Sequence, residues 1–187
     1  MALLRPVVRI LAVACAGLIV SAQGLYAADT PTENQVQAVF LFNFSRFVEW
    51  PAQAFAAPND PFVIGIVGSD PFGARLDEAV RNEQISGHTL TVRRFRSVSD
   101  VDNCQILFID RSEIGHLGQI LAMLDHRSTL TVSQAEGAAQ RGVMIQFATE
   151  NSRIRLRINV ESARAAGLTI SSKLLRPAEI VGAEVKE

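Results

Sequence analysis

The chain has 187 residues, of which 48% are hydrophobic, and its formal net charge at pH 7 is −1. This near-neutral balance excludes a general nucleic-acid-binding protein, which would carry a marked excess of basic residues. The length is sufficient for one domain with a substantial hydrophobic core.

Residues 1–27 are typical of an export signal. Arg5 and Arg9 precede the uncharged apolar stretch 10–20, and small residues before position 28 supply a cleavage site. Because the apolar stretch is short, a cleaved signal is favoured over an uncleaved membrane anchor, which is the alternative. We therefore expect a single exported α/β domain at 28–187 that is located in the periplasm.

The stretch 39–51, which holds four of the ten phenylalanines and the only tryptophan, organises the rest of the chain. Thr30, Pro31 and Glu33 predict a helix that begins here with Thr30 as its cap, and Pro51 is expected to end it.

Four apolar residues of this helix recur at helical spacing, namely Val36, Phe40, Phe44 and Phe47. The spacing predicts a helix face that packs on the core. A partly exposed face that binds a partner is the alternative.

Strand and helix patterns alternate from Phe62 onward. Apolar runs rich in branched residues predict buried strands, and helical stripes lie between them. The expected elements are strand 62–68, helix 69–82, strand 89–95, strand 104–110, helix 114–124 and strand 128–132. Helices between apolar strands imply right-handed crossovers and a largely parallel sheet.

The pattern changes near the C-terminus. Strands 143–149 and 153–160 are separated by three residues, which predicts an antiparallel hairpin, and short helices are expected at 162–166 and 171–175. The fold class is therefore α/β: a single layered domain with a largely parallel central sheet, flanking helices and an antiparallel C-terminal hairpin.

Gly68, Ser69 and Asp70 form a candidate ligand turn, because a glycine-bearing turn between a strand and a helix can bind phosphate on its backbone amides. The glycine spacing is not that of a dinucleotide-binding motif, however, and Asp70 would repel a phosphate. The simpler interpretation is that Asp70 caps the following helix. Asp70 and Asp110 also both end predicted parallel strands, where a catalytic or metal pair is the alternative to ordinary turn carboxylates.

Arg153, Arg155 and Arg157 alternate with apolar residues along a predicted strand. Side chains at alternate strand positions stand about 7 Å apart, so this row is a candidate contact for an acidic partner or an anion. The alternative is that the charges keep an exposed sheet from pairing with another chain.

Cys104 is the only cysteine that remains after residue 27, so an internal disulfide is excluded and a small buried residue is the simplest interpretation. His88, His116 and His126 are scattered and show no ligand or dyad spacing. The sequence therefore predicts no catalytic residue, no metal site and no cofactor.

Several separated blocks of the sequence, in the same order, resemble the YfiR family of small periplasmic proteins. The blocks are 39–51, 62–65 with 70–73, 104–109 and 166–176. The resemblance implies a non-enzymatic periplasmic regulator that restrains a membrane-bound diguanylate cyclase through the periplasmic sensor domain of that enzyme, lowering cyclic-di-GMP signalling and biofilm formation.

The same resemblance implies further partners, namely an outer-membrane lipoprotein and a second copy of the chain, whereas the charge balance already speaks against nucleic acid as a partner. In the best-studied member, redox control depends on paired cysteines. Cys104 matches one of them and has no second cysteine after residue 27 to pair with, so disulfide-based sensing is not expected here. The alternative function is a periplasmic small-ligand-binding protein or enzyme with its site at the C-terminal ends of the parallel strands.

Overall fold

The structure of the protein is a computed structural model that describes residues 31–151 and 153–182. The expected export signal, 1–27, lies outside the described residues. Within the two described ranges, none of the helices has the length and apolar character needed to cross a membrane.

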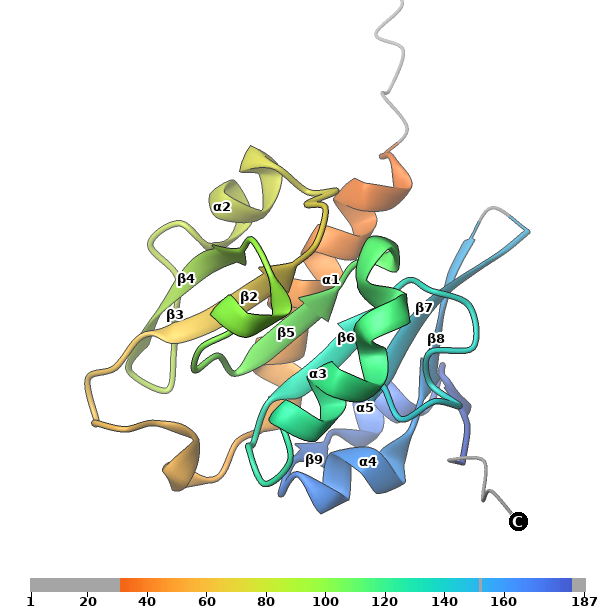
Figure 1. Cartoon of the computed structure of the whole chain (residues 1–187). Coiled ribbons are helices and arrows are strands. Elements are labelled where there is room, and N and C mark those ends of the chain that lie inside the picture. The colour runs from red at the N-terminus through yellow and green to blue at the C-terminus, as the bar shows by residue number, and fades with distance from the viewer. Residues whose placement is uncertain (1–30, 152, 183–187) are drawn as a thin grey trace, which may run out of the picture. The chain divides into compact units, whose positions relative to one another are not determined.

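A sheet with the strand order β10-β8-β7-β6-β5-β2-β4-β3 forms the centre of the described part of the chain (Figure 1). The strands are β2 (Phe62–Val67), β3 (Gln84–Ile85), β4 (His88–Phe95), β5 (Ile106–Ile109), β6 (Leu130–Ser133), β7 (Ile145–Glu150), β8 (Arg153–Ile158) and β10 (Glu179–Ile180). The inner strands from β4 to β7 are parallel, and β7 and β8 are antiparallel. The predicted fold class, a largely parallel sheet with an antiparallel C-terminal hairpin, is confirmed.

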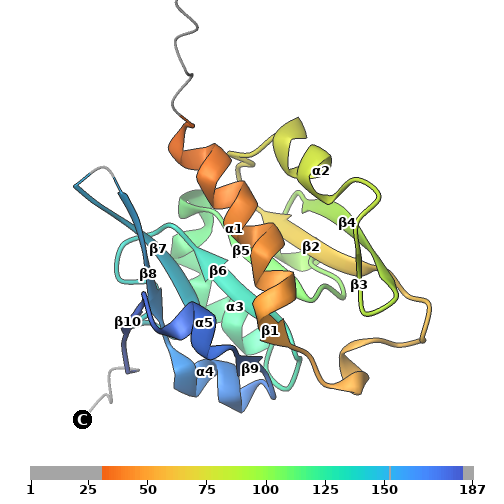
Figure 2. The ribbon, with the colours of Figure 1, turned by 180° about the vertical axis from the view of Figure 1, so that it is seen from behind.

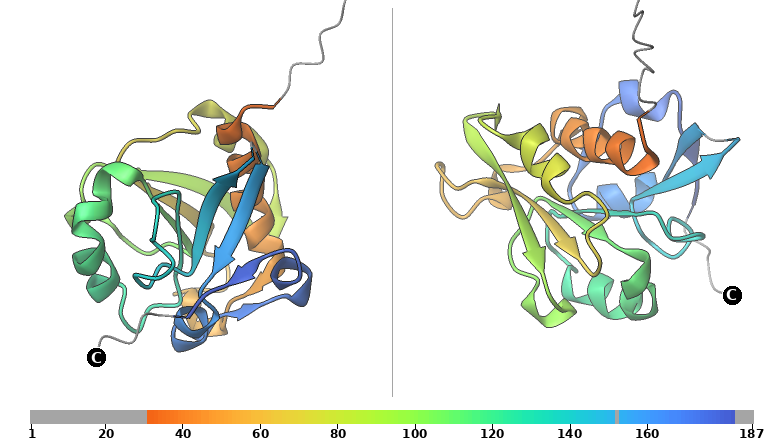
Figure 3. Two further views of the ribbon diagram at one scale, coloured as in Figure 1. Left: turned by 90° about the vertical axis from the view of Figure 1, so that its right-hand side faces the viewer. Right: turned by 90° about the horizontal axis from the view of Figure 1, so that it is seen from above.

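Helices cover both faces of this sheet (Figures 2 and 3). The core under one face receives side chains from α1 (Glu33–Phe47), α2 (Ala74–Val80), α4 (Val160–Ala165) and α5 (Ser172–Leu175). The core under the other face receives side chains from the short helix η2 (Val98–Asp100) and from α3 (Leu117–Met123), which follows the helical turn η3 (Arg111–His116). The sheet is therefore buried on both sides, as continuous apolar strands require.

Helix α1 begins later than the sequence indicated. Its cap is Thr32, whose side chain accepts a hydrogen bond from the Gln35 N–H while the Gln35 side chain accepts one from the Thr32 N–H. The prediction that Thr30 caps the helix is wrong. The reciprocal pair formed by Thr32 and Gln35 satisfies the N–H groups of both residues at the start of the helix.

The end of α1 also differs from the prediction, since the helix stops at Phe47 rather than at Pro51. The next two residues form β1 (Val48–Glu49), which pairs antiparallel with β9 (Thr169–Ile170). The short helix η1 (Ala52–Ala54) follows. A pairing partner far along the chain thus ends the helix before the proline does.

The buried face of α1 is rotated relative to the predicted one. Its fully buried positions are Gln37, Ala38, Leu41, Phe44 and Ser45. Phe40 and Phe47 pack at the side of the core, and Val39 is 52% exposed. Two polar residues thus lie on the core-facing stripe, which an apolar pattern could not reveal.

Candidate functional site

The carboxyl ends of β2 and β5 mark the point where the chain leaves the sheet in opposite directions. The connection from β2 leads to β4 on one side, whereas the connection from β5 leads to β6 on the other. Open α/β sheets bind ligands at such a switch point. The loops that follow these strands, 68–73 and 110–113, contain the glycine turn and both carboxylates that the sequence singled out.

Gly68 has a φ of +91°, and a Cβ at this position would lie 2.6 Å from Ser112 Oγ and 2.8 Å from Glu113 Cγ. The N–H of Ser69 donates to Ser112 Oγ at 3.3 Å. The loop after β5 therefore packs directly into the glycine turn, and one amide that the sequence offered to a phosphate already has a partner within the protein.

Asp70 accepts hydrogen bonds from the N–H groups of Phe72 and Gly73 through Oδ1, at 2.8 and 3.2 Å. Because α2 begins only at Ala74, with Gly73 at its cap, Asp70 stabilises the turn before α2 and does not cap the helix as predicted. Its Oδ2 accepts from Arg94 Nε at 2.7 Å.

Arg94 of β4 joins this turn to α2. Its Nη2 lies 2.6 Å from Asp77 Oδ2 and also donates to the carbonyl of Gly73 at 3.0 Å. The hydrogen bond from Arg94 lowers the pKa of Asp77. The sequence did not single out this arginine, because nothing in its spacing shows which carboxylates it meets.

Asp110 is only 6% exposed and is held by protein donors as well. Its Oδ2 accepts from the Ser112 N–H at 2.8 Å, and its Oδ1 accepts from Gln134 Nε2 at 3.0 Å. Each of the two candidate carboxylates thus has its own internal partners. Across residues 31–151 and 153–182, no group of three or more His, Cys, Asp or Glu side chains could hold a metal ion.

A polar groove of about 700 Å³ lies beyond the end of β6 and along β7, where residues 146–150 line it. Arg111 lines it from the start of η3 and donates to the carbonyl of Gln134 at 3.4 Å, and Arg141 lines it from the loop before β7 and donates to the carbonyl of Ile114 at 3.2 Å. Arg157 lines it from β8. The sequence reasoning missed Arg111 and Arg141, although Arg111 directly follows a buried strand.

The three arginines of β8 lie on one face of the strand, as predicted. Arg157 is 26% exposed and donates to Glu150 at 3.0 Å and to Glu179 at 2.9 Å. The hydrogen bond to Glu179 raises its pKa. Arg153 and Arg155 are exposed, so the row divides into one internally paired residue and two that face solvent.

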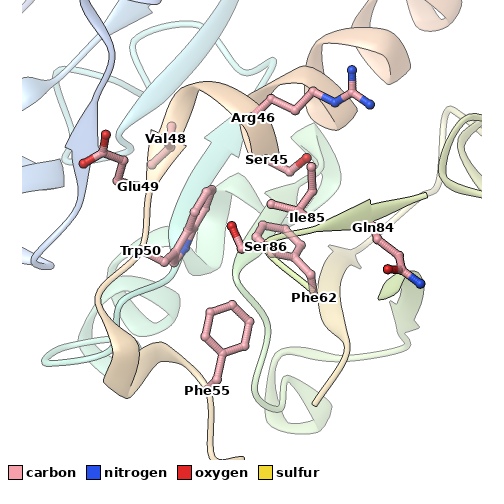
Figure 4. A pocket seen from close by; sticks show the side chains of 10 residues that line it. All are labelled: Ser45, Arg46, Val48, Glu49, Trp50, Phe55, Phe62, Gln84, Ile85 and Ser86. Carbon is pink, nitrogen blue, oxygen red and sulfur yellow. The ribbon is translucent and has the colours of Figure 1, made fainter. Parts of the chain in front are cut away.

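A second hollow, of about 470 Å³, surrounds Trp50 at the opposite end of β2 (Figure 4). The rings of Trp50 and Phe62 meet edge to face at 4.9 Å, and Trp50 Nε1 donates to the Gln105 carbonyl at 3.1 Å. Phe55 stacks on His88 with the ring centres 3.8 Å apart. These contacts give the predicted aromatic stretch a packing role.

Cys104 is buried, as predicted, and burial raises the pKa of its thiol to about 12. A thiol with such a pKa is protonated near neutral pH and is a poor nucleophile. Cys104 is therefore not an activated nucleophile.

The strand order and the helices on both faces define a doubly wound α/β domain. The chain belongs to the YfiR/HmsC-like family, whose model matches residues 34–179. No curated protein matches the chain.

Among solved structures, the ABC domain from Streptococcus pneumoniae in complex with L-Trp matches with a TM-score of 0.52 and 12% sequence identity. The match covers 79% of this chain and 60% of that one, so this chain spans less than two thirds of that domain. At this identity the likeness shows the fold alone.

Proposed function

We propose that the protein is a non-enzymatic periplasmic regulator that binds the periplasmic sensor domain of a membrane-bound diguanylate cyclase and restrains the enzyme. Restraint would lower cyclic-di-GMP and biofilm formation. The observation that carries the proposal is the family match, which extends over 34–179 and thus over nearly all of the described domain. The family is that of regulators in the diguanylate cyclase system.

The geometry of the switch point supports a function at the surface. The carboxylates that a catalytic centre would use there, Asp70 and Asp110, are held by Arg94 and by Gln134. Exposed charge lies instead on the arginine row of β8 and on the groove beside it. Protein–protein recognition uses charges in such positions to select and orient a partner.

The test is genetic and biochemical. Deletion of the gene is expected to raise cellular cyclic-di-GMP in a strain that has the partner cyclase and to leave it unchanged in a strain without that cyclase. The immobilised mature protein is expected to retain the cyclase from a detergent-solubilised membrane extract. An unchanged cyclic-di-GMP level after deletion in the strain with the cyclase would overturn the proposal.

Export and further partners are parts of the same proposal. The chain would reach the periplasm through a cleaved signal at 1–27, and an outer-membrane lipoprotein would relieve the restraint. Sequencing the N-terminus of the protein from a periplasmic extract tests the first part, since an intact Met1 would contradict cleavage. Sedimentation of the purified protein tests whether it forms a homodimer.

A second candidate function is the binding of a small ligand in the polar groove. The observation that favours it is the position of the groove, which begins beyond the carboxyl end of β6, where α/β sheets place ligands. A ligand that binds the folded state raises its melting temperature. The melting temperature is measured with a panel of small carboxylates and phosphates, and Arg141→Gln, which removes a charge from the groove, is the control variant. No shift in melting temperature across the panel would contradict this function.

A further inference from the structure

The outer edge of β8 is only partly covered. On its inner side β8 pairs with β7 from Arg153 to Ile158, whereas on its outer side it pairs with β10 only at Arg157 and Ile158. Within the part of the chain that the structure describes, no strand pairs with the outer edge of 153–156. Figures 1 and 2 show this part of the hairpin extending beyond the rest of the sheet.

The direction of the backbone groups along this edge follows from two hydrogen bonds. The N–H of Asn159 donates to the Met144 carbonyl, just before β7, at 2.8 Å, and the carbonyl of Ile158 accepts from the Val181 N–H, just after β10, at 3.0 Å. Because these directions alternate along an antiparallel strand, the N–H and carbonyl of Ile154 point outward, away from β7. Unpaired groups of this kind are a template for another strand.

The side chains of β8 alternate as well. Leu156 and Ile158 are buried in the core, and Ile154 packs against it from a partly buried position. Arg153 and Arg155 lie on the opposite face and are exposed. A strand added at this edge would therefore need acidic side chains beside the arginines and apolar ones beside the isoleucine and leucine.

The pairing of β10 with β8 already shows this alternation of residue types. In β10, Glu179 lies opposite Arg157 and accepts from its Nε at 2.9 Å, and Ile180 lies opposite Ile158. The covered end of β8 is thus met by an acidic residue followed by an apolar one. The uncovered end repeats the same two residue types at 153–154 and 155–156.

We propose that the free edge of β8, residues 153–156, binds an extended segment of a partner protein in which acidic and apolar residues alternate. Main-chain hydrogen bonds to Ile154 would supply affinity, and Arg153 and Arg155 would select the acidic positions. This inference rests on the proposed function and identifies a surface for it. A second copy of the chain does not fit, because two β8 edges would place arginines against arginines.

A synthetic peptide tests the edge directly. The peptide Glu-Val-Glu-Val-Glu-Val, blocked at both ends, is titrated into the mature protein, and Lys-Val-Lys-Val-Lys-Val serves as the charge-reversed control. We expect the acidic peptide alone to bind and to slow hydrogen exchange at the amide of Ile154. No binding of the acidic peptide at concentrations up to about 1 mM would overturn the proposal; a Kd of about 1 mM corresponds to a binding free energy of about −4 kcal/mol.

Two substitutions separate main-chain pairing from simple charge attraction. Ile154→Pro removes an N–H that points away from β7, a position where an edge strand tolerates proline, and is expected to abolish peptide binding. Ile154→Val keeps the N–H and should bind like the unmodified protein. Arg155→Glu is expected to weaken binding at least about tenfold, whereas Arg75→Glu, an equal charge change at an exposed residue of α2, should not.

Each further outcome has a definite meaning. Equal peptide affinity of the folded Ile154→Pro variant and the unmodified protein would overturn the proposal, because charge alone would then explain binding. A homodimer that Ile154→Pro dissolves would also overturn it, with a second copy as the occupant. If the peptide fails to bind while gene deletion still raises cyclic-di-GMP, the edge is wrong and the proposed function stands.

Discussion

Arg94 determines the local charge at the switch point between β2 and β5. It contacts Asp70 and Asp77 through its guanidinium, so it neutralises the carboxylate that the sequence offered as a ligand and ties the turn after β2 to α2. The position of Asp70 at a strand end could be predicted from the sequence. Its partner could not, because Arg94 lies on a different strand and becomes a neighbour only through the pairing of β2 with β4.

Replacing Arg94 is expected to make stability depend less on pH. The pKa of Asp77 is lowered in the folded state, so Asp77 contributes stability above its unfolded pKa and loses it as the pH falls through the folded value. Because the side chain of Asp77 is 43% exposed, solvent screening limits the effect to about 1 kcal/mol.

The measurement is urea unfolding of Arg94→Gln and the unmodified protein at pH 7 and pH 3. We expect the difference in unfolding free energy at pH 7 to shrink at pH 3. Arg75→Gln on the exposed face of α2 is the control. A difference that is the same at both pH values would show that the Asp77 interaction does not contribute.

Two glycines are expected to respond to alanine with opposite signs. Gly68→Ala combines a positive φ with close approaches to Ser112 and Glu113, and should cost about 2–3 kcal/mol. Gly118 lies within α3, and a Cβ there would have no heavy atom within 4 Å, so Gly118→Ala should stabilise by about 0.5–1 kcal/mol. Thermal unfolding of both variants checks this, and a neutral Gly68→Ala would show that the loop after β5 can retreat.

At the scale of elements, long patterned segments were predictable and short ones were not. The apolar runs identified β2 and β5 because burial on both faces leaves a continuous apolar sequence. The two-residue strands β1, β3, β9 and β10 carry no pattern, and each exists only because a partner lies beside it. The break after Phe47 has this origin, since its carbonyl accepts from the Ser171 N–H at 2.8 Å.

The start of α1 illustrates a choice between overlapping signals. Thr30 with Glu33 and Thr32 with Gln35 both fit the pattern of a reciprocal cap, and nothing in the local pattern ranks one above the other. The structure has the second arrangement. Local patterns therefore predict that a helix begins here but not at which residue.

Removing the hydroxyl of Thr32 should weaken α1. Thr32→Ala is expected to lower the free energy of unfolding by about 1 kcal/mol, because the N–H of Gln35 loses its side-chain acceptor. Thr32→Ser keeps the hydroxyl and should retain most of the stability. Chemical denaturation of both variants measures the effect, and equal losses in both would argue against the cap.

At the scale of the whole molecule, the fold class was predictable and the relations between distant segments were not. Alternating strands and helices indicated a parallel sheet, and the order of the strands emerged only in the structure. The candidate site shows the same division. The arginine row was visible as a period of two, whereas the groove beside it combines Arg111 of η3 with Arg141 of a loop, which only the fold brings together.

The thiol of Cys104 is expected to report on opening of the whole domain. Because the residue is buried and its pKa is about 12, a thiol reagent at pH 8 should label it only after unfolding. Labelling in native buffer is compared with labelling in about 6 M guanidinium chloride, followed by mass spectrometry. Rapid labelling in native buffer would show local opening around β5.

The two residues of β10 have a consequence for how selective the hairpin is. Since Glu179 and Ile180 already pair with one end of β8, β10 limits the number of β8 residues with which a partner strand can pair. A chain cut before Glu179 would have a longer unpaired edge on β8, and Arg157 would lose Glu179 as a partner while keeping Glu150. Proteolysis before Glu179 would then broaden the range of acidic segments that the protein binds, and the inner strands of the sheet would remain unchanged.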